Sequence, residues 1–173
     1  MKSQTVFAWC FFVVWSTWMF ALQSWLGALG SAARWVPDLG LVMALSLVAR
    51  LDPADVPLCA LLTALARSAF GVEPHVVVCA GVLGVFALAL AARSVVELTG
   101  PVWRALVCGG LVFAFDAWLM LVHRARPPAG FGTFGVSIAS AWSVALTSAL
   151  LAWIVGPVLA HLPGLTPLRR RRW

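Results

Sequence analysis

Few side chains in this sequence could do chemistry, and Arg67 and Asp116 are unusual because they fall inside long apolar runs. Asp116 lies six positions before the end of the run over 102–122, and Arg67 lies three positions before the end of the run over 56–70. At about 1.5 Å per helical residue, the two side chains would sit at a similar depth. A charge inside a membrane is costly unless it is paired. We therefore expect an ion pair between Arg67 and Asp116 that serves packing; a proton-relay or ligand-binding role is the alternative.

The remaining patterns do not favour catalysis. Intramembrane aspartyl peptidases need two convergent aspartates near an asparagine motif, whereas this sequence contains no asparagine, and the start of a helix already explains Asp38. The segment 130–135 reads GxGxxG, but no strand precedes it, so we interpret it as a turn. We expect a protein that is not an enzyme.

Metal and cofactor sites are not indicated either. The four cysteines lie in separate apolar runs without a CxxC pair, which favours a role in helix packing. The histidines are expected at helix ends, and none has a ligand neighbour four residues on. The cysteines are Cys10, Cys59, Cys79 and Cys108, and the histidines are His75, His123 and His161. We expect no cofactor and no metal.

The composition places these residues in a membrane. Hydrophobic residues make up 62% of the 173 residues and charged residues only 10%, against about 45–50% and about 25% in soluble domains. We expect an all-α polytopic integral membrane protein with a bundle of about six transmembrane helices, over 6–26, 37–51, 56–70, 75–92, 102–122 and 134–162. The first run is longer than a signal-peptide core, so we interpret it as a retained helix. Residues 1–168 would form one domain and 169–173 a basic tail.

The positive charges suggest an orientation. Six helices place both termini on one side, which collects eight Lys and Arg residues, four of them in the tail: Lys2, Arg50, Arg93, Arg104, Arg169, Arg170, Arg171 and Arg172. The opposite side collects four, Arg34, Arg67, Arg124 and Arg126. The positive-inside rule predicts cytoplasmic termini, with the arginine tail near anionic lipid. This scattered pattern is not typical of nucleic-acid binding.

Two helices carry rows that could contact other helices. Small residues recur at multiples of four in the last helix, at Ser140, Ser148, Ala152 and Gly156, a spacing that lets helices approach closely in lipid. Packing within the bundle and docking of another protein both explain this row. Trp15, Trp18 and Trp25 share one face of the first helix, which would meet lipid or a partner helix. Pro157 is expected to kink the last helix.

Taken together, this plan resembles the MreD family, the small membrane component of the bacterial rod-shape machinery. The segment Pro37-Asp38-Leu39 resembles the family's arginine/proline-aspartate-leucine signature. The segment 60–71 is similar to its leucine-rich helix that ends in an aspartate and a small-residue turn, although Arg67 stands in place of the aspartate.

The resemblance implies a non-enzymatic component of the cell-wall elongation complex in the bacterial cytoplasmic (inner) membrane. It would bind MreC-type partners, help determine cell shape and need no small-molecule ligand. The family is similar in fold to substrate-binding subunits of energy-coupling-factor vitamin transporters, which is the alternative function. In that case Arg34, Arg67, Asp116 and the loop 123–135 could line a cavity near the outer face.

Overall fold

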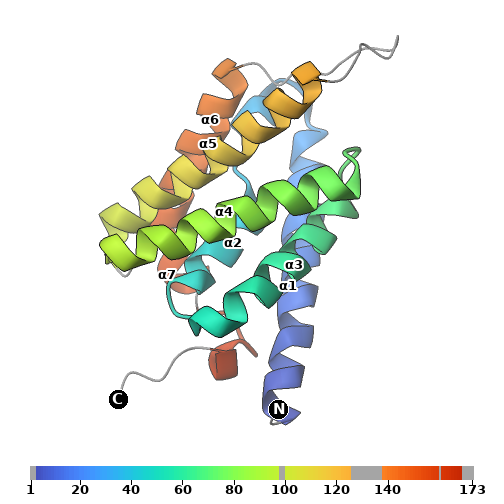
Figure 1. Cartoon of the computed structure of the whole chain (residues 1–173). Helices are drawn as coiled ribbons and strands as arrows, with labels where there is room; N and C mark the ends of the chain where they lie inside the picture. Colours follow the sequence, from blue (N-terminus) through green and yellow to red (C-terminus); the bar gives the residue numbers. More distant parts are fainter. Residues whose placement is uncertain (1–2, 98–99, 126–137, 160, 169–173) are drawn as a thin grey trace.

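The protein is mainly helical, without strands, in the part that the computed structural model describes, residues 3–97, 100–125, 138–159 and 161–168 (Figure 1). The main helices are α1 (Ser3–Gly27), α2 (Leu39–Val48), α3 (Val56–Ser68), α4 (His75–Val95), α5 (Pro101–Ala125) and α6 (Ile138–Ile154), followed by the single turn α7 (Gly156–Leu159). Three short 3₁₀ helices connect them: η1 (Gly30–Trp35), η2 (Pro53–Asp55) and η3 (Thr166–Leu168).

Three of these helices are long and apolar enough to cross a membrane. They cover Gln4–Gly27, His75–Val95 and Pro101–Ala125, and they contain the first, fourth and fifth of the runs expected from the sequence. The apolar helices Leu39–Val48 and Ile138–Ile154 are shorter. These lengths and compositions are those of a membrane protein, and a span of about 30 Å of hydrocarbon requires about 20 helical residues.

Helix α2 forms the centre of the fold. Nine of its ten residues are buried, and it packs against α1, α3, α4, α5, α6 and α7. A helix this short could not cross a bilayer unaided. Its neighbours enclose it from all sides, so its apolar side chains pack against protein.

Side chains satisfy backbone groups at both ends of α2. At its start, the Asp38 carboxylate accepts a hydrogen bond from the Leu41 N–H at 3.0 Å, as an N-cap does. At its end, the Arg93 guanidinium on α4 donates to the carbonyl oxygens of Val48, at 3.1 Å, and Leu51, at 2.6 Å. The helix therefore ends at Val48 rather than continuing to residue 51.

The last apolar run forms two helices instead of one. Helix α6 ends at Ile154 and α7 begins at Gly156, next to Pro157, which lacks the N–H needed to continue the helical ladder. The break confirms the kink expected at this proline.

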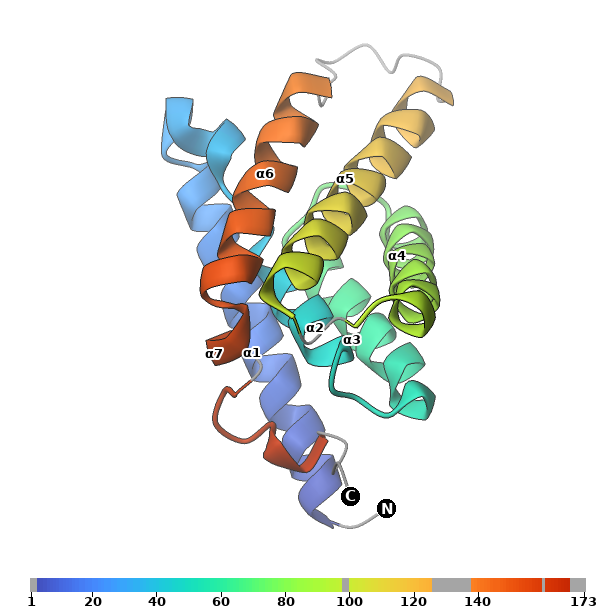
Figure 2. The ribbon, with the colours of Figure 1, turned by 90° about the vertical axis from the view of Figure 1, so that its left-hand side faces the viewer.

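The two ends of the described chain lie together. Helix α1 begins beside η3 at one end of the bundle (Figure 2), and the Trp15 Nε1–H donates to the Pro163 carbonyl oxygen at 3.3 Å. The opposite end is formed by η1, the end of α5 and the start of α6, and α2 lies between the two ends.

Candidate functional site

A cavity of about 390 Å³ lies between the end of α1, η1, the start of α2 and the first turns of α6. Its walls come from α1, η1, the start of α2, α3, α5 and α6. Gly27, Arg34 and Gly71 line it and are exposed, so the cavity opens to the surface. Apolar side chains such as Phe20, Val36 and Val144 alternate with the charged ones. Arg34, Arg67 and Asp116, expected as the lining of a possible binding site, do share this cavity.

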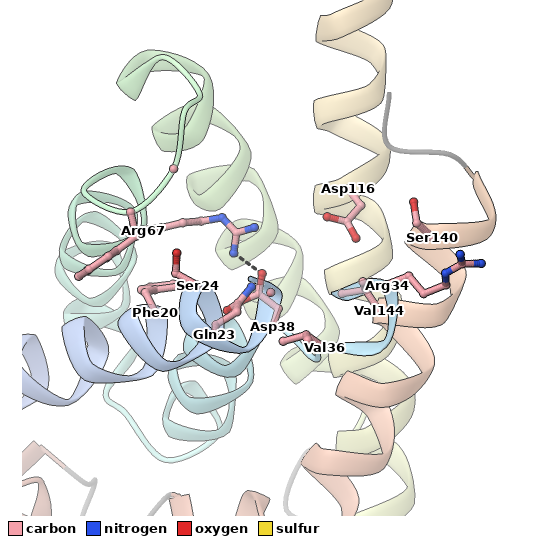
Figure 3. A pocket seen from close by; sticks show the side chains of 13 residues that line it. Phe20, Gln23, Ser24, Arg34, Val36, Asp38, Arg67, Asp116, Ser140 and Val144 are labelled. Carbon is pink, nitrogen blue, oxygen red and sulfur yellow. Dashed lines mark hydrogen bonds and ion pairs between the residues drawn. The ribbon is translucent and has the colours of Figure 1, made fainter. Parts of the chain in front are cut away.

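The ion pair of Arg67 is made with Asp38 and not with Asp116 (Figure 3). The N-cap position before α2 and the penultimate position of α3 fall at the same end of these two neighbouring helices, so the side chains meet there. The Asp38 side chain is almost fully buried and the Arg67 side chain is 17% exposed. The expected Arg67–Asp116 pair is therefore corrected to Arg67–Asp38, because depth in a membrane does not determine which face of a helix a residue occupies.

Three further groups hold this pair in place. The Asp38 backbone N–H donates to the Ser148 Oγ on α6 at 2.9 Å. The Arg67 guanidinium carbon lies 4.3 Å from the ring centroid of Phe115 and 5.6 Å from that of Phe20, distances at which a cation is attracted to an aromatic face. The pair thus connects α1, α2, α3, α5 and α6 at one point.

Asp116 lines the same cavity from α5, and Figure 3 shows its carboxylate turned toward the space between Arg67 and α6. Only 8% of the residue is exposed. None of the described residues forms a hydrogen bond or ion pair with it. A nearly buried carboxylate without a partner is costly, so Asp116 is the residue of this site that packing does not explain.

The small-residue row of α6 packs mainly inside the molecule. Ser148, Ala152 and Gly156 are buried, and the Ala152 carbonyl oxygen accepts a hydrogen bond from the Arg104 Nε–H at 3.0 Å. A Cβ at Gly156 would come within 2.7 Å of the Arg104 Nε. Ser140 is partly exposed and lines the cavity. Of the two explanations for the row, the structure supports packing within the bundle for its buried members.

The three tryptophans of α1 separate into two groups. Trp18 and Trp25 are 68% and 63% exposed, whereas Trp15 is partly buried and bonded to the C-terminal segment. The helical turn explains this division: three residues rotate a position by about 60°, but seven rotate it by only about 20°. Trp18 and Trp25 form an outward face, and Trp15 belongs to its inner edge.

The other chemistry-bearing residues are dispersed. All four cysteines are free thiols, and no group of three metal-binding side chains is found within the described residues. His123 pairs with Glu73 at 2.7 Å, and His161 contacts Arg50 at 2.9 Å. The GxGxxG segment and the tail residues Arg169, Arg170, Arg171 and Arg172 lie outside the described residues.

Gln23 and Ser24 were not foreseen as members of the site. Both line the cavity from α1, and the Gln23 Oε1 is buried without a hydrogen-bond donor in the described structure. Adjacent polar residues near the end of an otherwise apolar helix were the available signal in the sequence.

No protein-family model matches this sequence, and comparisons with curated proteins and with solved structures give no match either. Family and function therefore rest on the motifs and on the geometry of the site.

Proposed function

We propose that this chain is a non-enzymatic scaffold of the bacterial cell-wall elongation complex, related to MreD, that binds MreC-type membrane proteins and helps determine cell shape. The observation that carries the proposal is the place of Pro37-Asp38-Leu39, the segment most similar to the MreD signature. It begins the buried central helix α2, and Arg67, from the second similar segment, closes onto its aspartate. The two segments behind the resemblance thus form one structural unit.

The outward faces of α1 and α6 support a role in binding other membrane proteins. Helix α1 exposes Phe7, Phe11, Val14, Trp18 and Trp25, and α6 exposes Ile138, Trp142, Leu146, Leu150 and Ile154. The α1 set follows three- and four-residue spacing along one side of its helix, and the α6 set recurs at every fourth residue, so it winds gradually around its helix. Such stripes suit lipid or a partner helix, and aromatic residues are frequent in the cores of protein interfaces.

A six-span arrangement with cytoplasmic termini in the inner membrane belongs to this proposal. The adjacency of α1 and η3 supports an even number of crossings. Arg50, Arg93 and Arg104 lie toward the end that holds the termini, as their contacts with His161, Leu51 and Ala152 indicate. Together with Lys2 and the arginine tail, they favour a cytoplasmic location of that end.

The cavity favours a second candidate, a substrate-binding subunit of an energy-coupling-factor type transporter. Its volume of about 390 Å³ falls within the range of small-molecule sites, and its lining combines apolar walls with convergent charges. This candidate would require coupling and ATPase subunits as partners.

Affinity purification of the tagged chain from its native membrane in mild detergent tests both candidates. The scaffold proposal predicts stoichiometric recovery of an MreC-type protein, and loss of that protein when Trp18 and Trp25 are both replaced by alanine. Leu83→Ala and Leu88→Ala on α4, also exposed, serve as the matched control and should retain the partner. Recovery of paired ATPases with a coupling subunit, and of no wall proteins, would refute the scaffold and support the transporter.

A further inference from the structure

The cavity presents one carboxylate that lacks a protein donor. The Asp116 carboxylate faces it with 8% of the residue exposed and without a hydrogen bond or ion pair in the described structure. Buried acceptors are nearly always satisfied in folded proteins, by protein, water or a ligand, so the donor to Asp116 comes from outside the chain.

The charges of the cavity indicate the kind of donor. Arg67 makes its close ion pair with Asp38, which leaves the Asp116 carboxylate without an ion pair of its own among the described residues. On the exposed rim, no hydrogen bond or ion pair joins the Arg34 guanidinium to another described residue. Figure 3 places Asp116 and Arg34 on different walls, beside Ser140. A bound group that matches both would be positive at Asp116 and negative near Arg34.

From this arrangement we propose that the cavity binds a zwitterionic group in which a primary ammonium stands beside an anionic group. The ammonium donates to the Asp116 carboxylate, and the anion is attracted to Arg34. A primary ammonium has three N–H donors for the Asp116 carboxylate. A quaternary ammonium has none. The headgroup of phosphatidylethanolamine and a free phosphoethanolamine-like zwitterion share this chemistry.

The proposal does not depend on the scaffold function, and it is tested on the purified full chain in maltoside detergent. Thermal unfolding is measured with added phosphatidylethanolamine, phosphatidylcholine, phosphatidylglycerol or soluble O-phosphoethanolamine. At about ten times the apparent dissociation constant, phosphatidylethanolamine should raise the midpoint by about 3–6 °C. The other two lipids should have a clearly smaller effect. Stabilisation by O-phosphoethanolamine as well would identify a free zwitterion as sufficient; stabilisation by the lipid alone would identify a lipid site.

Single variants test separately the residue that would bind the ammonium, Asp116, and the residue that would attract the anion, Arg34. Asp116→Asn should weaken the phosphatidylethanolamine effect by about tenfold or more in apparent affinity, because it removes the charge while keeping the shape. Arg34→Gln, at an exposed position, should weaken the response to O-phosphoethanolamine but not to ethanolamine. Asp52→Asn, an exposed N-cap of η2 away from the cavity, is the control and should respond like the wild type.

Equal stabilisation by all three lipids would overturn the proposal. So would an Asp116→Asn protein whose midpoint still rises with phosphatidylethanolamine as the wild type does. If Asp116→Asn does not fold, the Arg34→Gln comparison and the ranking of the three lipids on the wild type still decide the outcome.

Discussion

The ion pair between Arg67 and Asp38 should couple α2 and α3 energetically, and a double-mutant cycle can measure this coupling. Asp38 is 1% exposed, and its carboxylate keeps only the Leu41 N–H as a partner when Arg67 is removed. Breaking a buried pair by removing one member costs about 3–5 kcal/mol. Because 17% of the Arg67 side chain is exposed, we expect Arg67→Met to cost about 3 kcal/mol.

The single variant Asp38→Asn and the double variant should lose less stability than Arg67→Met. Asp38→Asn keeps an N-cap oxygen for α2, since Asn and Asp are equivalent in that role. It loses only the charged hydrogen bond, which is worth about 1.5–3 kcal/mol. The double variant leaves neither a carboxylate nor a guanidinium without its partner. We therefore expect it to cost about 2 kcal/mol in total, with a coupling energy of about 2.5–4 kcal/mol.

Equilibrium unfolding in mixed micelles with increasing SDS, followed by tryptophan fluorescence, would give these free energies. The Glu73–His123 pair is the matched control, because its side chains are 19% and 33% exposed. Its cycle should yield less than about 1 kcal/mol. Additivity of Arg67→Met and Asp38→Asn within about 0.5 kcal/mol would refute the reasoning, as would a larger coupling between Arg67 and Asp116.

Three further substitutions test the packing around α2 by the same unfolding measurement. Gly109→Ala should destabilise the protein by about 1–3 kcal/mol because its Cβ would lie 2.8 Å from a side chain of α6. The control Gly110→Ala meets open space and should be neutral or stabilising by up to about 1 kcal/mol. Equal effects of the two substitutions would contradict the α5–α6 contact. Ser148→Ala should cost about 1–3 kcal/mol because it leaves the Asp38 backbone N–H, at the start of α2, without its acceptor. The control Ser46→Ala removes a hydroxyl that has no partner in the described structure and should cost nothing. A larger loss of stability for Ser46→Ala than for Ser148→Ala would contradict the Asp38–Ser148 hydrogen bond. Arg93→Met should cost about 1–3 kcal/mol because two carbonyls at the end of α2 lose their donor, and an unchanged stability would show that they are satisfied in another way.

The positions of the helices could be predicted from the sequence, because apolar runs and helix-breaking residues are local signals. The run over 102–122 became Pro101–Ala125 and the run over 75–92 became His75–Val95. The break at Pro157 was also foreseeable. The second helix was expected to be short, but its end at Val48 was not foreseeable. The donor to the Val48 carbonyl oxygen is Arg93, more than forty residues away along the chain.

The charged members of the site were predictable, but Gln23, Ser24 and the pairing of Arg67 were not. Arg67 and Asp116 were both found from their unusual place in apolar runs, and both line the cavity. Depth along a helix gives one coordinate, however, and the rotation of each helix decides which carboxylate an arginine meets. Asp38 was assigned to the start of α2, and it also pairs with Arg67.

The spacing of the small residues on α6 could not decide whether they pack within the bundle or against another protein. Small residues every four positions permit close approach to any helix, whether in the same chain or in another. The structure directs the buried members of the row toward Asp38 and Arg104. The apolar side chains that α6 and α1 leave exposed are the surfaces that the proposed scaffold would offer to a partner.

Photo-crosslinking in living cells tests the proposed scaffold most directly. A photoreactive residue is placed at Trp18 on α1 or at Trp142 on α6, with exposed Leu88 on α4 as the comparison position. The scaffold predicts a specific adduct with an MreC-type protein from α1 or α6, and none from Leu88. Adducts with lipid alone at both tryptophan positions, or with a transporter coupling subunit, would contradict it.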